Sequence, residues 1–248
     1  MSQEETDAFY KYIFEEGVLH YCGNDRNVKR LIDMRDGGII YSGDKPDFFI
    51  LKDNHLLIVE HFEFDCYPVT KRGGSSFRLE DARITKRENA VIPKENESVE
   101  IHDIIRGEPT YQNYIQNATR SFTKHYTKID LYISNLKAQG VPVENMDIEI
   151  MFFIVDVSPL GSVVLSNKKD NWATIPVVLA LSSEFLELLE KSPRVNYVLA
   201  CSEYNGHIYR WLIDRKQLNK YRKKTENYST MEMPRLTPHV LTIKRLLS

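Results

Sequence analysis

Residues 46–65 read PDFFILKDNHLLIVEHFEFD, and this stretch decides the fold that the sequence predicts. Two mostly apolar runs, 47–51 and 56–65, flank Asp53-Asn54, a pair that suits the tight turn of a hairpin. If these two residues form the loop, the numbers of paired residues add up to 107, as 53 and 54 do. Asp47 is then predicted to lie directly opposite Glu60, on one face of the two strands.

The predicted register brings two carboxylates together, because opposed side chains on antiparallel strands have Cβ atoms about 4.5–5.5 Å apart. Like charges at this separation destabilise a sheet unless one group is protonated, the pair is solvated, or a cation lies between them. We expect Mg²⁺, or Mn²⁺ in its place, because one or two carboxylates with waters and phosphate oxygens form the usual Mg²⁺ shell. Lys45 falls opposite Phe62 in the same register and is predicted to place an ammonium group beside the acids.

Pro46-Asp47 on one strand, followed by Glu60 at the end of an apolar run on the next, resembles the motif of the PD-(D/E)xK nuclease superfamily. The elements predicted between residues 7 and 157, a helix, three strands, a helix and a strand, are similar in order to the core of that superfamily. The resemblance implies a restriction-endonuclease-like core in which Asp47 and Glu60 hold Mg²⁺ for the hydrolysis of phosphodiester bonds. It also implies a lysine two residues after the second acid, which helps to position or activate the attacking water.

The chain departs from the motif at the position of that lysine, where it has Phe62. A phenyl ring carries no charge, so in an active enzyme a different side chain must supply the positive charge of the missing lysine. The candidates are Lys45 across the hairpin, and Arg120 and Lys124 on the following helix. An inactive relative that binds nucleic acid or a protein partner fits the same residues. A subunit of a larger assembly, in which the hairpin is only core structure, also fits these residues.

Alternative acids follow Glu60 on the same strand. His61, Glu63 and Asp65 share the opposite face and form a second set of oxygen and imidazole donors. With Glu63 and Asp65 as the acids, the motif becomes an E-x-D variant. A strand end that emerges into water explains these residues without a site. Ordinary surface or core positions are expected for three further histidines, His102, His125 and His207.

The whole chain predicts a mixed α/β fold, with a central mixed sheet flanked by helices, in one domain over residues 1–248. Apolar residues at helical spacing, or in short β-rich runs, mark the remaining elements. Helices are predicted over 9–18, 28–32, 111–140, 183–191 and 239–247, and further strands over 39–41, 147–157, 195–204 and 207–213. Asn205-Gly206 predicts the turn of a second hairpin. Residues 66–109 are predicted to be a polar, irregular insert, and a basic tail begins near residue 216.

Charge is unevenly distributed along the chain. The net charge of −2 gives no overall attraction to nucleic acid. Residues 71–87, however, carry six basic and two acidic side chains, and residues 210–224 carry seven and one. Such segments suit phosphate groups, although most charge runs only face solvent. The candidate nucleic-acid contacts are Lys71, Arg72 and Arg78 in the insert, and Arg120 and Lys124 on the long helix.

Composition and missing motifs argue against several classes of protein. The longest apolar stretches, 148–157 and 175–181, are far shorter than the roughly 20 residues that cross a bilayer, so no membrane segment is predicted. The acidic N-terminus lacks the features of a secretory signal, and a cytoplasmic location is expected. Three cysteines without CxxC spacing argue against a disulfide framework or a thiolate zinc site. No GxSxG, no HExxH and no GxGxxG after a strand is present. The oligomeric state stays open, with a homodimer among the options.

Overall fold

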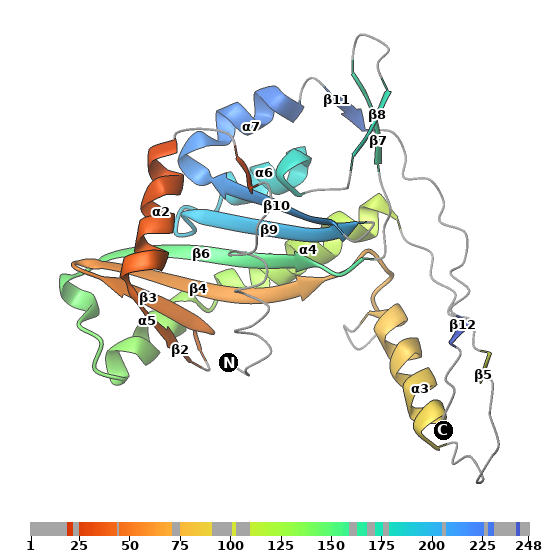
Figure 1. Ribbon diagram of the computed structural model, residues 1–248, viewed down its shortest axis with the longest axis horizontal. Coiled ribbons are helices and arrows are strands. Elements are labelled where there is room, and N and C mark those ends of the chain that lie inside the picture. The colour runs from red at the N-terminus through yellow and green to blue at the C-terminus, as the bar shows by residue number, and fades with distance from the viewer. Residues whose placement is uncertain are drawn as a thin grey trace.

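The computed structural model places a seven-stranded mixed sheet at the centre of the protein (Figure 1). It describes residues 19–21, 25–43, 45–70, 75–90, 101–102, 110–158, 163–167, 172–175, 179–204, 207–225, 228–230 and 242–243. In spatial order the strands of this sheet are β1 (Leu19–Tyr21), β10 (His207–Asp214), β9 (Tyr197–Tyr204), β6 (Asp147–Asp156), β4 (His55–Phe64), β3 (Phe48–Lys52) and β2 (Ile39–Ser42). The other described strands form two small sheets, β11 (Tyr228–Thr230) with β7 (Val163–Asn167) and β8 (Trp172–Ile175), and β12 (Thr242–Ile243) with β5 (Ile101–His102). The predicted mixed α/β class with a central mixed sheet is confirmed.

β3 and β4 form the predicted hairpin in the predicted register. Phe48 pairs with Val59, and Lys52 pairs with His55, so the numbers of paired residues add up to 107. Asp53 in the turn has a φ of 52°, a left-handed conformation that aspartate tolerates. β4 runs parallel to β6, and β6 runs parallel to β9. The carboxyl ends of these three strands therefore lie on one side of the sheet, which we call the carboxyl edge.

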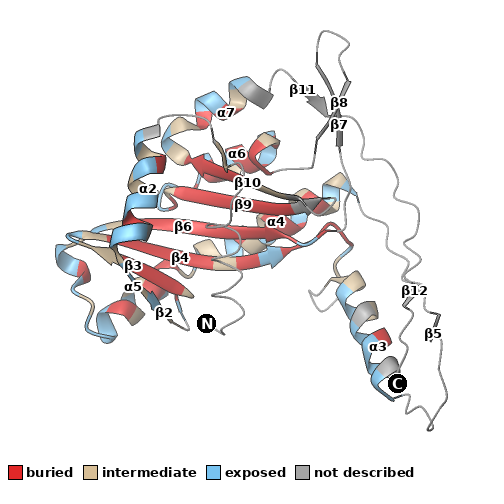
Figure 2. Cartoon of the chain, in the orientation of Figure 1, coloured by how far each residue is buried: buried red, intermediate tan, exposed pale blue. Residues whose placement is uncertain are grey.

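Helices cover both faces of the central sheet (Figures 1 and 2). On one face, Ile58 and Phe62 of β4 belong to a core cluster with residues of α4 (Tyr111–Tyr126), α5 (Ile129–Ala138), α6 (Ser183–Glu190) and α7 (Leu218–Thr225). On the other face, Leu57 and Val59 pack in a second cluster with α2 (Asp25–Gly37). Burial on both faces explains the nearly continuous apolar runs of β4 and β6. No described helix is both long and apolar enough to cross a membrane.

The insert predicted to be irregular contains a helix. α3 spans Ser76–Ala90, and the prediction for these residues was wrong. Its sequence, SFRLEDARITKRENA, has few apolar residues, so periodicity does not reveal the helix. At its start, the Ser75 hydroxyl accepts a hydrogen bond from the backbone N–H of Arg78 at 3.4 Å. The helix carries Arg78 to the carboxyl edge of the sheet, where that side chain contacts two acids of the hairpin.

The long helix predicted from residue 111 to Gly140 is divided into α4 and α5. Thr110 caps α4, because its hydroxyl accepts the N–H of Asn113 at 3.0 Å. A turn at Thr127-Lys128 separates the two helices. The prediction of one continuous helix was therefore wrong, and the division changes which side chains of α5 face the sheet.

Most other predicted elements are confirmed with small changes in their ends. These are α2, β2, β6, α6, β9 and β10. The remaining described pieces are short 3₁₀ turns, η1 (Val143–Asn145), η2 (Leu179–Leu181) and η3 (Arg215–Gln217). The helix predicted over 9–18 lies outside the described residues. Within 239–247, only Thr242–Ile243 is described, and it forms a strand instead of the predicted helix.

Candidate functional site

Asp47 precedes Phe48 and Glu60 follows Val59, the last residue pair of the hairpin, so continuation of the same register puts the two acids opposite each other. Phe49 and Ile58 belong to the cluster on the α4 side, so Asp47 and Glu60, two residues further along each strand, also face α4 and α5. Asp47 is half-buried, and its Oδ2 accepts the backbone N–H of His61 at 2.6 Å. Glu60 is only 4% exposed. Both acids are therefore held within the fold.

Two side chains from the helical layer bind one oxygen of Glu60. The Tyr132 hydroxyl on α5 donates to Oε1 at 2.6 Å, and Nδ1 of His125 on α4 lies 2.7 Å from the same oxygen. The pKa of Tyr132 is raised by burial, by its hydrogen bond to Glu60 and by the negative charges of Glu60 and Asp47. The effect of both charges on one hydroxyl indicates that the carboxylates lie close together. The second oxygen, Oε2, is buried and has no hydrogen-bond partner in the described part of the chain.

Phe62, at the position where the superfamily has lysine, is a core residue with 6% exposure. Its ring stacks on that of His125, with centroids 4.5 Å apart and an interplanar angle of 12°. Its ring also makes an edge-to-face contact with that of Phe152, with centroids 5.5 Å apart. An imidazole ring thus covers one face of Phe62.

The candidate cations differ in what they contact. Lys45 is exposed, and its backbone carbonyl accepts a hydrogen bond from Asn135 of α5 at 2.9 Å. Arg120 and Lys124 are exposed on α4. Arg78 pairs with Glu63 at 3.2 Å and approaches Asp65 at 3.5 Å, so the alternative acids bind a cation of their own chain. Two further candidates, Lys71 and Arg72, lie outside the described residues.

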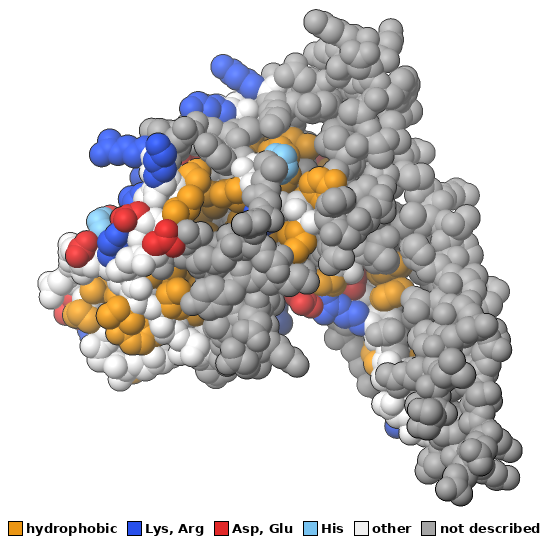
Figure 3. Space-filling model, viewed as in Figure 1, with side chains coloured by type: hydrophobic (Ala, Val, Ile, Leu, Met, Phe, Trp, Pro, Cys, Tyr) orange, Lys and Arg blue, Asp and Glu red, His pale blue; other side chains and the backbone are white. Residues whose placement is uncertain are grey.

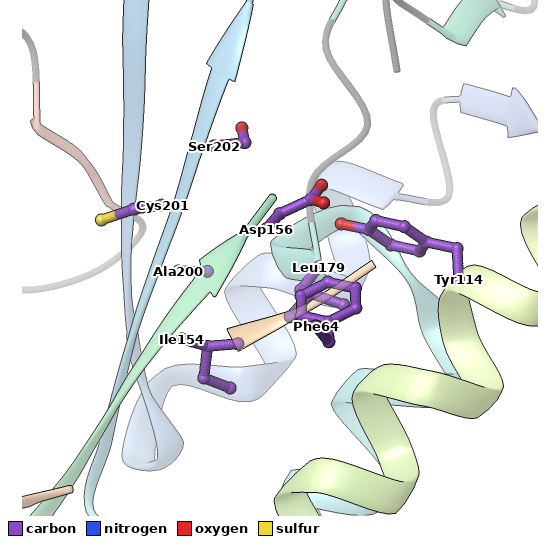
Figure 4. Close-up of a pocket in the computed structure, with 8 residues that line it drawn as sticks. All are labelled: Phe64, Tyr114, Ile154, Asp156, Leu179, Ala200, Cys201 and Ser202. Carbon is purple, nitrogen blue, oxygen red and sulfur yellow. The ribbon is translucent and has the colours of Figure 1, made fainter. Parts of the chain in front are cut away.

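A second buried carboxyl group, Asp156, lies at the carboxyl edge at the end of β6 (Figure 4). It borders a cavity of about 10 Å³, close to the space that one water molecule needs, together with Tyr114 and Ser202. Burial raises the pKa of Asp156 to about 7 and the charge of Asp65 adds to this, against hydrogen bonds from Ser158 and Tyr114 that lower it. Sequence reasoning missed Asp156, although an acid at the end of a buried strand is a usable signal.

His125 and Tyr132 were also missed as site residues, since His125 was expected to be an ordinary histidine. The long-helix prediction left Tyr132 outside the apolar stripe. In the structure Tyr132 is fully buried and Ile133 beside it is only partly buried. The break at Thr127-Lys128 thus turns Tyr132 toward Glu60.

Some basic side chains of residues 210–224 are buried in the fold or paired with an acid. Arg210 is buried in β10, and Arg222 pairs with Glu190 at 2.5 Å. Figure 3 shows Lys and Arg side chains gathered over α7 and the adjoining end of α2. Exposed members of this group are Arg26, Lys29, Lys216 and Lys220. This basic surface lies at the end of β10 that is opposite to the carboxyl edge, and β9 and β6 separate β10 from β4, the strand that carries Glu60.

The acid pair offers few protein ligands to a metal ion. The described ranges contain no group of three or more His, Cys, Asp or Glu placed to hold a metal. Asp47 and the unpartnered Oε2 of Glu60 offer two carboxylates, and Mg²⁺ commonly takes one or two with waters and phosphate oxygens completing its shell. The donor set therefore suits an ion that keeps much of its water. Comparisons of this chain with family models, with curated proteins and with solved structures found no match.

Proposed function

We propose that this protein is a Mg²⁺-dependent phosphodiesterase that cleaves nucleic acid, with Asp47 and Glu60 as the metal ligands. One observation carries the proposal: a buried oxygen of Glu60 has no hydrogen-bond partner among the described residues, and the register of the hairpin, continued by one residue, puts the carboxylate of Asp47 opposite it. A buried polar atom without a partner costs roughly 1–3 kcal/mol, and more when it is charged. A cation shared by the two acids offsets this cost and their mutual repulsion.

The described residues have separate tasks in this proposal. The N–H of His61 orients Asp47, while Tyr132 and His125 orient Glu60 by binding Oε1, and Oε2 has no hydrogen-bond partner among the described residues. When bound, the metal supplies charge that polarises a phosphate oxygen and activates a water molecule. The exposed cations Lys45, Arg120 and Lys124 are assigned to the phosphate backbone, with Mn²⁺ able to take the place of Mg²⁺.

Cleavage of labelled single-stranded and double-stranded DNA and RNA, with Mg²⁺ or Mn²⁺, tests the proposal. Asp47→Asn and Glu60→Gln should each lower kcat by more than about 100-fold, because a metal that polarises the phosphate supplies several kcal/mol. Glutamine keeps an acceptor for Tyr132, so Glu60→Gln should preserve the fold. Glu63→Gln on the same strand is the matched control and should keep its activity. Absence of cleavage by the wild type with either metal, or full activity of Asp47→Asn, would remove the proposal.

A second candidate function is a noncatalytic module that binds nucleic acid or a protein partner. The packing of Phe62 into the core, where the superfamily motif has lysine, favours it. Such a module would bind nucleic acid in EDTA and after Asp47→Ala, with an affinity that falls as salt rises. That result, together with no cleavage, would favour this second function.

A further inference from the structure

Hydrolysis at the acid pair needs a side chain that receives the proton of the attacking water. A general base must come within about 2.6–3.2 Å of that proton's oxygen, or act through one water. Asp47 and Glu60 are assigned to the metal, and each already accepts a hydrogen bond from the protein. The base is therefore to be sought among their neighbours.

His125 contacts the pair directly. A carboxylate only accepts hydrogen bonds, so the 2.7 Å contact with Glu60 Oε1 assigns the proton of the neutral ring to Nδ1. The other nitrogen, Nε2, then carries a lone pair, and none of the described residues hydrogen-bonds to it. The side chain is 15% exposed, which leaves room for a water molecule to reach it.

The orientation of this ring is fixed from three directions. Phe62 stacks on its face at 4.5 Å, Glu60 holds Nδ1, and the Tyr132 hydroxyl lies 3.3 Å from the same nitrogen. A ring held in this way loses little freedom when it meets a substrate, which favours efficient proton transfer. The arrangement of a carboxylate behind an imidazole is also one that stabilises the ring once it has gained a proton.

We infer that His125 is the general base of the reaction, an inference that rests on the proposed function. The oxygen of a water molecule forms a bond to phosphorus while Nε2 takes one of its protons. The bond between phosphorus and the leaving ester oxygen breaks, and its electron pair stays on that oxygen, which takes a proton from solvent. Glu60 balances the positive charge that His125 gains.

The neighbouring cations are less suited to this task. Lys45, Arg120 and Lys124 are exposed, and no hydrogen bond or ion pair joins their side chains to Glu60 within the described ranges. Arg78 is bound to Glu63 and Asp65. Arginine, in addition, does not give up its proton in proteins and cannot act as a base.

The test combines kinetics with Mn²⁺ binding measured by electron paramagnetic resonance. His125→Gln offers an amide donor to Glu60 but no basic nitrogen, so it should bind Mn²⁺ within about tenfold of the wild type while kcat falls by about 100-fold or more. In His125→Ala, added imidazole should restore part of kcat by entering the space over Phe62. His55→Gln is the matched control, because His55 also lies beside a carboxylate, Asp147, at the far end of β4. Its kcat should not change.

The outcomes separate the inference from the function on which it rests. Wild-type protein that neither binds Mn²⁺ nor cleaves nucleic acid would refute the proposed function and the role of His125 together. Wild-type cleavage that survives in His125→Gln, or a His125→Ala variant that folds and does not respond to imidazole, would refute the role of His125 alone. If His125→Ala does not fold, the kcat of His125→Gln decides.

Discussion

Asp156→Asn is expected to remove a large part of the pH dependence of stability. Asp156 lies at the end of β6 with 9% exposure, and its Oδ1 accepts the backbone N–H of Ser158 at 2.9 Å. Its pKa is about 7 in the folded protein, because burial disfavours the charged form. The folded state therefore binds this proton more tightly than the unfolded chain does, where the pKa is about 3.9.

The size of the effect follows from these two pKa values. The stabilisation is complete below about pH 4 and is lost as the pH rises through about 7. Each unit between the two pKa values is worth 1.36 kcal/mol, so the whole effect is on the order of 4 kcal/mol. Between pH 5 and pH 8 the wild-type protein should lose roughly 3 kcal/mol of its free energy of unfolding through this residue. Asparagine carries no titrating proton and avoids that loss.

Urea denaturation at pH 5 and pH 8 measures this difference. From pH 5 to pH 8, the free energy of unfolding of Asp156→Asn minus that of the wild type should rise by roughly 3 kcal/mol. Glu187→Gln on the exposed face of α6 is the control and should follow the wild type. Parallel pH profiles for Asp156→Asn and the wild type would refute the reasoning, because they would mean that Asp156 keeps an ordinary pKa in the folded protein.

Three further substitutions test individual contacts that stabilise the fold. Tyr132→Phe removes the hydroxyl that binds Glu60 and should lower the free energy of unfolding, measured in urea, by about 2 kcal/mol. Arg30→Ala leaves the buried carboxylate of Glu149 without the partner that lies 2.6 Å away, and the midpoint of thermal unfolding should fall by an amount equivalent to about 3 kcal/mol. Thr110→Ala removes the cap of α4 and should cost about 1 kcal/mol by the same urea assay.

Exposed neighbours serve as controls for these substitutions. Thr123→Ala on α4 and Lys29→Ala on α2 should each change stability by less than about 0.5 kcal/mol. If Tyr132→Phe or Arg30→Ala were as mild as its control, the hydrogen bond or ion pair in question would not contribute to the fold. A Thr110→Ala variant as stable as Thr123→Ala would mean that the start of α4 does not depend on its cap.

The hairpin and its acid pair could be predicted from the sequence because their signals are local. Alternation along two short runs and the turn at Asp53-Asn54 determine the register, and the register determines that Asp47 lies opposite Glu60. The central sheet was predictable for a similar reason, since β6 and the β9–β10 hairpin are strongly apolar. The superfamily resemblance stays a prediction, because it depends on a short motif that lacks its lysine.

The partners of Glu60 could not be predicted, because they depend on how two helices pack. In one uninterrupted helix, Ile133 would stay in line with Phe122 and Tyr132 would lie roughly 80° to one side. The turn at Thr127-Lys128 changes this alignment, and nothing in the hydrophobic pattern signals it. Asp156 and α3 were missed for other reasons: the pKa of Asp156 depends on burial, and α3 has too few apolar residues to show a period.

The attachment of α4 and α5 to a single carboxylate oxygen links local dynamics to the chemistry of Glu60. His125 is in the last turn of α4, and Tyr132 is in the first turns of α5. Loss of that oxygen would release both helices at their junction, and amide hydrogen exchange in α5 would then accelerate before global unfolding. A ligand that draws Glu60 toward itself would act on the same junction, so its binding should change the hydrogen-exchange protection of α5.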